Sequence, residues 1–262
     1  MPPRWSHGDF AGLSLWPDIS TGVYAGALCG AFCLGFSKTG FPGLALVNVM
    51  LMAELFGAKE SVGIILPLLI CADITVFPMF RRYATWKQVV PLLVPIAFGL
   101  VAGYFLLGNI DNRIARPTIG AIILTMTGLQ LLRVYRQEFL THLPDAPVFR
   151  WGSGLVIGVS TMMANAAGPA YSIYALVHKM KKEDFLGIGA RTFLLVNIVK
   201  VPFMTDLDII NPASLKIDLA LLPGVFTGIL VGRKVIAKIP QKLFEILLYI
   251  FSIIAGSRLL FF

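Results

Sequence analysis

The stretch "CLGFSKTGFPGLALV" places Lys38 between Ser37 and Thr39 inside an otherwise apolar region, a combination typical of an anion-binding site. If this break lies within the membrane, the next helix begins just after Gly40 and Gly43, and its free N–H groups point back toward the lysine. A helix N-terminus beside an ammonium group attracts an anion, and the two hydroxyls add hydrogen-bond donors. The alternative is that Lys38 lies in a cytoplasmic loop.

Arg191 and its neighbour Thr192 form a second candidate anion contact, in the stretch "DFLGIGARTFLLVNIVK". The guanidinium fork of an arginine matches the geometry of an oxyanion. The alternative is that Arg191 is a structural partner of Asp73 or of another carboxylate. Lys200 lies near the far end of the same stretch, and we expect its flexible side chain to reach the membrane interface.

Asp73 is the only acid that the sequence places in the middle of an apolar segment. A charged side chain at the centre of a membrane helix costs about 2.5–3.5 kcal/mol on insertion scales, so each such residue is a candidate for function. Asp73 could carry a proton in a coupled transport cycle, because burial favours a neutral carboxyl. It could also be a fixed counter-ion to Lys38 or Arg191, and the two roles are compatible.

A second break occurs in "STMMANAAGPAYSI", where small residues again interrupt an apolar run. Asn165 and Gly168 are the candidate binding residues of this break, and Tyr171 and Ser172 follow it. Asn197, in a later segment, is expected mainly to pack or to form a hydrogen bond between helices.

The composition indicates a membrane protein. Of the 262 residues 57% are hydrophobic and 14% are charged, and the mean hydropathy is +0.80, whereas soluble domains carry about 25% charged residues. The net charge of +8 is explained by basic cytoplasmic loops, so no nucleic-acid partner is expected. The lipid bilayer is the expected environment. The three cysteines lie in apolar runs as packing residues, and we expect no metal and no other cofactor.

Apolar stretches divide the chain into ten segments. They run at about 19–36, 44–56, 61–80, 88–107, 114–132, 151–164, 169–178, 185–204, 217–232 and 243–261. About 20 residues are needed to cross a bilayer, so the short stretches suggest half-helices or hairpins that turn back. We expect a polar N-terminal segment over 1–18 without a cleaved signal peptide, one transmembrane unit over 19–132, a cytoplasmic linker over 133–150 and a second unit over 151–262.

The basic residues predict the sidedness of the chain. If the segments alternate, one set of loops holds most of the Lys and Arg residues, including those of "RRYATWK" and "HKMKK". These loops should be cytoplasmic, which places both termini outside the cell membrane. Replacing a short pair of segments by a hairpin leaves this prediction unchanged.

The two units share a weak internal similarity. At an offset of 124 residues "AKESVGIILPLLICADITVFPMF" aligns with "KEDFLGIGARTFLLVNIVKVPFM", so that Asp73 corresponds to Asn197. Farther along, "PIAFGLVAG" resembles "PGVFTGILVG", and both contain a Gly-x-x-x-Gly pair that we interpret as a helix-packing device. Because each unit has five segments, the second should be inverted relative to the first. Inverted repeats with paired broken helices are typical of secondary transporters.

We therefore predict an all-α polytopic membrane protein. It should contain two inverted-topology repeats of about five helical segments each, with short broken or re-entrant helices that meet near the midplane.

The break "GFSKTGFPG", its looser counterpart "NAAGPA" and the five-plus-five organisation resemble the sulfite exporter TauE/SafE family over nearly the whole chain. Many members carry three consecutive glycines in the first break, where this chain has Thr39-Gly40-Phe41-Pro42-Gly43. The resemblance implies export of a small sulfur-containing anion, sulfite or an organosulfonate, across the cytoplasmic membrane, through alternating access with or without proton coupling.

Two other functions are alternatives to a coupled exporter. An uncoupled anion channel or permease would use the same residues. An intramembrane enzyme is disfavoured, because the three histidines fall in predicted loops or at segment ends and the chain has no Gly-x-Ser-x-Gly motif. The sequence is compatible with an oligomer and leaves the oligomeric state open.

Overall fold

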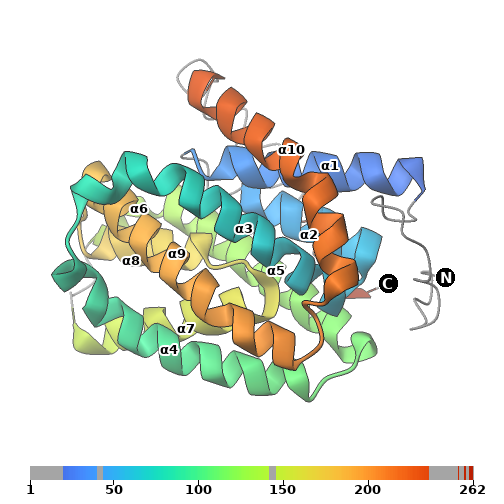
Figure 1. Cartoon of the computed structure of the whole chain (residues 1–262). Helices are drawn as coiled ribbons and strands as arrows, with labels where there is room; N and C mark the ends of the chain where they lie inside the picture. The colour runs from blue at the N-terminus through green and yellow to red at the C-terminus, as the bar shows by residue number, and fades with distance from the viewer. Residues whose placement is uncertain are drawn as a thin grey trace.

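The computed structural model describes residues 20–39, 44–141 and 146–235, together with residues 253, 257, 260 and 261. The described residues form helices and no strands (Figure 1). The elements are α1 (Thr21–Ser37), α2 (Leu44–Phe56), α3 (Ala58–Phe80), the 3-10 turn η1 (Arg81–Tyr83), α4 (Trp86–Gly108), α5 (Asn112–Tyr135), α6 (Gln137–Thr141), α7 (Pro147–Ala164), α8 (Gly168–Val177), α9 (Lys182–Asp206) and α10 (Pro212–Val235).

Local side chains set several helix ends. The Ser20 hydroxyl accepts a hydrogen bond from the backbone N–H of Val23 at the start of α1, and Asp111 does the same for Ile114 at the start of α5. These bonds satisfy N–H groups that have no partner within the helix. The C-terminal end of α7 is set by Asn165, which adopts a left-handed conformation with φ of 52°. Asparagine tolerates this backbone conformation better than most residues.

Helices α1 and α2 form a hairpin that enters the protein and turns back. Gly26, near the start of α1, lies against Leu55 near the end of α2, and Gly30 lies against Asn48 and Met52. The two helices are therefore antiparallel neighbours, and the tip of the hairpin is the break at Lys38. With 13 residues, α2 is about 20 Å long, too short to cross a membrane on its own.

Helices α7 and α8 form a second hairpin. The ring of His178, just after α8, lies 6.2 Å from the ring of Phe149 near the start of α7, so α8 returns toward the end where α7 began. The tip of this hairpin is the break at Asn165. The 10 residues of α8 extend about 15 Å. Both short helices thus turn back along the helix before them, as in the hairpin arrangement that the sequence allowed.

Helices α3 and α9 lie side by side at the centre of the molecule and run in opposite directions (Figure 1). Gly63 lies against Ile209 at one end, Asp73 bonds Asn197 in the middle, and the carbonyl of Arg81 accepts from Arg191 at the other end. These pairings show that α3 and α9 contact each other along their length, with Asp73 and Asn197 in the middle of the pair.

The most extensive helix contacts are those of α4 with α7 and of α1 with α10. A Cβ atom added to Gly99 of α4 would lie 2.5 Å from the carbonyl oxygen of Leu155 in α7. One added to Gly228 of α10 would lie 2.2 Å from that of Phe32 in α1. The Gly-x-x-x-Gly pairs therefore act as packing devices, as expected, because only glycine lets the two backbones approach so closely.

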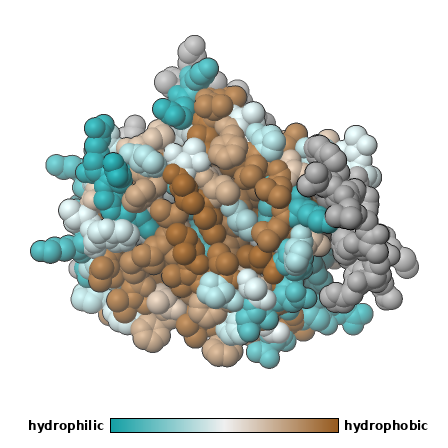
Figure 2. Space-filling view, viewed as in Figure 1, coloured by the Kyte–Doolittle hydropathy of each residue, from teal (hydrophilic) through white to brown (hydrophobic). Residues whose placement is uncertain are grey.

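Five of the described helices are long and apolar enough to cross a membrane: α3 with η1, α4, α5, α9 and α10. Their outer faces carry large apolar side chains, among them Ile74, Phe98 and Phe105, which are more than half exposed. Figure 2 shows an apolar surface across the middle of the molecule with polar residues toward its ends. This distribution fits a lipid environment. The predicted segments at 1–18 and 243–261 lie outside the described ranges, and α6 lies within the predicted linker.

Candidate functional site

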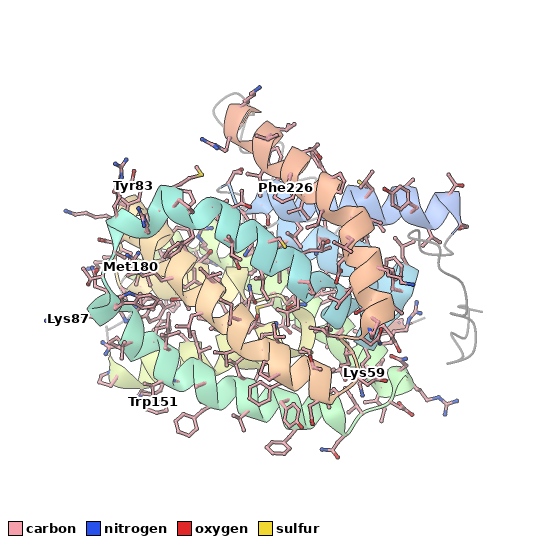
Figure 3. The ribbon with its side chains drawn as sticks, in the orientation of Figure 1. Lys59, Tyr83, Lys87, Trp151, Met180 and Phe226 are labelled. Atoms are coloured by element: carbon pink, nitrogen blue, oxygen red, sulfur yellow. The ribbon has the colours of Figure 1, made fainter. Side chains whose placement is uncertain are left out.

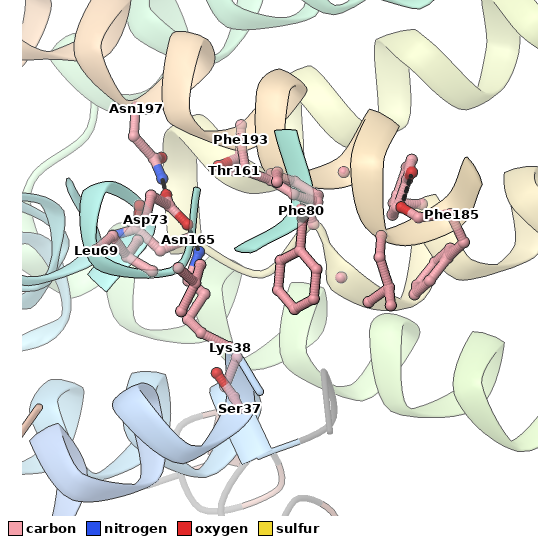
Figure 4. Close-up of a pocket in the computed structure, with 18 residues that line it drawn as sticks. Ser37, Lys38, Leu69, Asp73, Phe80, Thr161, Asn165, Phe185, Phe193 and Asn197 are labelled. Atoms are coloured by element: carbon pink, nitrogen blue, oxygen red, sulfur yellow. Dashed lines mark hydrogen bonds and ion pairs between the residues drawn. The ribbon is translucent and has the colours of Figure 1, made fainter. Parts of the chain in front are cut away.

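A cavity of about 130 Å³ lies where the two hairpin tips meet α3 and α9 (Figure 4). Its polar lining includes Lys38 from the first hairpin, Thr161 and Asn165 from the second, Asp73 from α3 and Asn197 from α9. Aromatic and aliphatic side chains line the rest. A few converging polar groups in an otherwise apolar pocket are typical of a small-molecule site.

Lys38 and Asp73 form an ion pair inside the protein. The Lys38 ammonium lies 2.5 Å from one carboxylate oxygen of Asp73, and the side chains are 16% and 3% exposed. Asn197 donates to the other oxygen of Asp73 at 2.7 Å, and the ammonium also lies 5.7 Å from the centre of the Phe193 ring. Lys38 is therefore at the hairpin tip within the protein and not in a peripheral loop, and Asp73 is its counter-ion.

Lys200 is completely buried, with an exposed fraction of 0%. Its ammonium donates to the side-chain oxygen of Asn165 at 2.5 Å and to the backbone carbonyl of Thr161 at 2.6 Å. The expectation that Lys200 reaches the membrane interface is wrong. The side chain instead turns inward because the tip of the second hairpin offers it carbonyl oxygens, and Asn165 is fixed from its other side by donating to the Val62 carbonyl at 2.9 Å.

The charges around the cavity do not balance. Among the described residues, Lys38 has Asp73 as its carboxylate partner, whereas Lys200 has only neutral oxygens as partners. With all three groups ionised, the site carries one excess positive charge in a region shielded from water. Buried charges normally require compensation, so the site is suited to an anion.

Two helix N-termini contribute to the same cavity. Ala45, in the first turn of α2, and Gly168, the first residue of α8, both line it. The unpaired N–H groups and the dipole at such ends favour negative charge. Gly40 and Gly43, which the sequence placed in the first break, lie outside the described residues.

The model of the family described as sulfite exporter TauE/SafE matches residues 19–259. This chain belongs to that family. No curated protein and no solved structure gave a match. Membership makes this TauE/SafE chain a membrane transporter of a family that exports sulfite and related sulfur anions.

The hydroxyls of the first break bond to their own helix in this TauE/SafE protein. Ser37 donates to the Leu34 carbonyl at 2.6 Å, and Thr39 donates to the Phe36 carbonyl at 2.7 Å. Ser37 still lines the cavity. The side chain of Thr39 packs instead against Gly232 of α10.

Arg191 of the TauE/SafE chain lies beside the cavity and not in its lining. One terminal nitrogen donates to the Arg81 carbonyl, and the guanidinium lies 5.8 Å from the centre of the Phe77 ring and 5.7 Å from that of Trp86. Within the part of the chain that the structure describes, its Nε and Nη1 atoms are buried and have no hydrogen-bond partner. Thr192 is fully buried, its hydroxyl also has no partner, and it is not part of the lining.

Sequence reasoning missed two buried ionisable residues of this TauE/SafE protein. The sequence predicts an interfacial position for Lys200 and singles out no role for Asp218, which lies at the very start of the predicted segment 217–232. Asp218 in fact lies within α10 and is 4% exposed, so the prediction that Asp73 is the only acid buried within a span is wrong. The available signal was the position of Asp218 next to the apolar run "LALLPGVF".

Proposed function

We propose that this protein exports sulfite or a small organosulfonate across the cytoplasmic membrane as a secondary transporter, binding the anion in the cavity between the hairpin tips. The observation that carries the proposal is the pair of lysines at the cavity, the partly buried Lys38 and the fully buried Lys200, which among the described residues are opposed by the one carboxylate of Asp73. Sulfite and sulfonate groups match this site in charge, size and number of acceptor oxygens.

The binding residues have separate roles in the proposal. Lys38 provides the direct charge, and an entering anion competes with Asp73 for its ammonium. Asn165 and the N-terminus of α8 at Gly168 provide neutral donors. Lys200 raises the local positive potential from behind Asn165.

Arg191 and its neighbour Thr192 are proposed to hold the anion at an earlier stage of its passage. Arg191 retains two buried N–H donors without a partner, and it lies between Phe77 and Trp86, at the end of α3 and the start of α4. Its near neighbour Ala190 lines the cavity. Arg191 is thus in a position to receive an anion that enters from this end.

The proposed conformation is one in which the cavity faces the cytoplasm. The lining extends from Asp73 toward Phe80 at the end of α3 and Phe185 at the start of α9. Exposed basic residues lie at the same end, including Arg81, Arg82 and Lys87. Figure 3 labels Tyr83, Lys87 and Met180 together at this end, and Lys59 at the opposite one. Basic loops are retained on the cytoplasmic side, so the termini would be outside.

Alternating access is proposed to arise from two inverted repeats. Helix α3 would correspond to α9, and Asp73 and Asn197, which correspond at an offset of 124, bond each other as residues near a two-fold axis would. The contact of Gly63 with Ile209 has a near-equivalent in that of Gly187 with Ala84. The pairing of α4 with α7 likewise matches that of α10 with α1. These features support the proposal.

Flux in proteoliposomes tests the function. Purified protein should move sulfite or methanesulfonate and exchange labelled for unlabelled anion, whereas liposomes with the Lys38→Met variant should not. Wild-type protein that moves neither anion would contradict the proposal. Exchange that is faster than net flux favours a carrier, because a channel or uncoupled permease needs no anion on the opposite side.

A further inference from the structure

Asp218 is a buried carboxylate without a hydrogen-bond partner among the described residues. Its side chain lies within α10, the residue is 4% exposed, and within the described part of the chain neither carboxylate oxygen accepts a hydrogen bond. Burying an ionised carboxylate without compensation is far more costly than burying a neutral one. Asp73 differs sharply, because an ammonium group and an amide hold its two oxygens.

In the described part of the chain, the surroundings of Asp218 contain no cation that forms an ion pair with it. Helix α10 packs against α1 and α3. From α3 the titratable group that acts on Asp218 is the thiol of Cys71. From α1 the nearby titratable group is Tyr24, whose hydroxyl donates to the carbonyl of Ala220, two residues from Asp218, at 3.1 Å. On α10 itself Lys216 is two residues away and half-buried. Among the described residues no Lys or Arg forms an ion pair with Asp218.

The helix that carries Asp218 is joined directly to the anion site. Gly228 of α10 packs on the backbone of α1 at Phe32, and the C-terminal end of α1 holds Lys38. Cys71, next to Asp218, lies two residues before Asp73 on α3. A change of charge on Asp218 therefore acts on the two helices that present the Lys38–Asp73 pair.

We propose that Asp218 is a proton-binding site that couples anion transport to the proton gradient, an inference that rests on the proposed transport function. The carboxylate takes up a proton when it is exposed to one side of the membrane and releases it to the other. The neutral carboxyl is the form that α10 accommodates against α1 and α3. The only bond made and broken is the O–H bond of the carboxyl group.

The test uses reconstituted full-length protein, with the membrane potential clamped. Methanesulfonate is the main probe because its charge does not change with pH, and sulfite is the second. Asp218→Asn copies the neutral form and should retain at least half of the wild-type anion exchange, while losing at least tenfold in accumulation driven by a pH gradient. The matched control is Asp208→Asn, because Asp208 is exposed, and it should keep both activities.

Each result decides between the possibilities. The proposal is overturned if Asp218→Asn accumulates anion like the wild type. It is also overturned if a folded Asp218→Asn variant loses both exchange and accumulation, since Asp218 would then belong to the anion path. If Asp218→Asn does not fold, the variant Asp218→Glu is used in its place. Moving the carboxyl group by one methylene should shift the pH midpoint of transport, and an unchanged midpoint refutes the proton-binding role of Asp218. Wild-type protein that moves neither anion contradicts the transport function and this inference together. Wild-type protein that exchanges anions but does not accumulate them when a pH gradient is imposed contradicts the inference alone.

Discussion

At the scale of single residues, the central feature is that a lysine and an aspartate from distant segments meet away from water. The Lys38 ammonium lies 2.5 Å from one carboxylate oxygen of Asp73, and the side-chain amide of Asn197 donates a hydrogen bond to the other oxygen. Removing one member of a buried ion pair leaves the other charge without compensation, which costs about 3–5 kcal/mol. A stability effect and a binding effect of substitution must therefore be separated.

Lys38→Met should weaken both folding and anion binding, whereas the double variant Lys38→Met/Asp73→Asn should recover thermal stability without recovering binding. The physical reason is that the double variant removes both charges, so that no buried carboxylate remains unpaired. We expect affinity for sulfite to fall at least tenfold in both variants, since a charged hydrogen bond contributes about 1.5–3 kcal/mol. Thermal unfolding and a binding titration measure the two effects, and wild-type affinity in the double variant would remove Lys38 from the site.

Lys200→Met tests the contribution of the second lysine. Methionine has a similar length and no charge, so we expect equal or higher thermal stability, because replacing a buried charge by an apolar group is often neutral or stabilising. Affinity for sulfite should nevertheless fall several-fold as the positive potential is lost. Asn165→Ala is the companion variant, since Asn165 connects Lys200 to the cavity. Unchanged affinity in Lys200→Met would show that Lys38 alone supplies the charge.

At the scale of helices, glycines determine how closely the elements approach. In the described chain, the contacts of α1 with α10 and of α4 with α7 pass through positions where a Cβ atom would overlap a neighbouring backbone. Such contacts fix the position of each hairpin relative to the long helices. They also provide the surfaces along which the helices would move in a transport cycle.

Gly228→Ala and Gly152→Ala form a matched pair of substitutions. A Cβ atom at Gly228 would lie 2.2 Å from the Phe32 carbonyl oxygen, whereas nothing lies within 4 Å of one at Gly152. We expect Gly228→Ala to destabilise the protein by about 1–3 kcal/mol through overpacking. Gly152→Ala should be neutral or slightly stabilising, because alanine favours a helix. Thermal unfolding in detergent measures both, and equal stabilities would contradict the close approach of α1 and α10.

At the scale of the whole molecule, the cavity lining extends toward the end of the protein that carries exposed basic residues. The cavity lining reaches Phe80 and Phe185, at the ends of helices that carry exposed basic residues. Exposed Asp111 and Asp208 lie near the opposite helix ends. The cavity lining therefore extends toward the end of the molecule where these basic residues lie.

A membrane-impermeant thiol reagent tests this orientation in a background in which Cys29, Cys33 and Cys71 are replaced. Leu186→Cys, in the cavity lining, should react from the cytoplasmic side, as should the exposed control Lys87→Cys. The exposed control Arg113→Cys should react only from outside.

Sulfite should slow the labelling of Leu186→Cys and leave that of Lys87→Cys unchanged. Labelling of Leu186→Cys from outside alone would reverse the proposed orientation.

The sequence by itself determined the membrane class, most helix limits and the two breaks. Long apolar runs interrupted by Gly, Pro and Asn leave few alternatives for a backbone that must satisfy its own hydrogen bonds in lipid. The predicted stretch 44–56 coincides with α2, and the run predicted at 151–164 ends where α7 ends, at Ala164. The placement of Lys38 and Asn165 at these breaks followed from the same pattern.

Only the tertiary structure decided which way each polar side chain faces. In a soluble helix one face is polar, so periodicity reveals the buried side, but in a membrane helix both the lipid-facing and the protein-facing sides are apolar. The sequence therefore did not distinguish a snorkelling Lys200 from a buried one, nor show that the side chain of Asp218 is buried. Those positions depend on partners more than thirty residues away, such as Asn165 for Lys200, and on the turning back of the short helices that brings both breaks to one cavity.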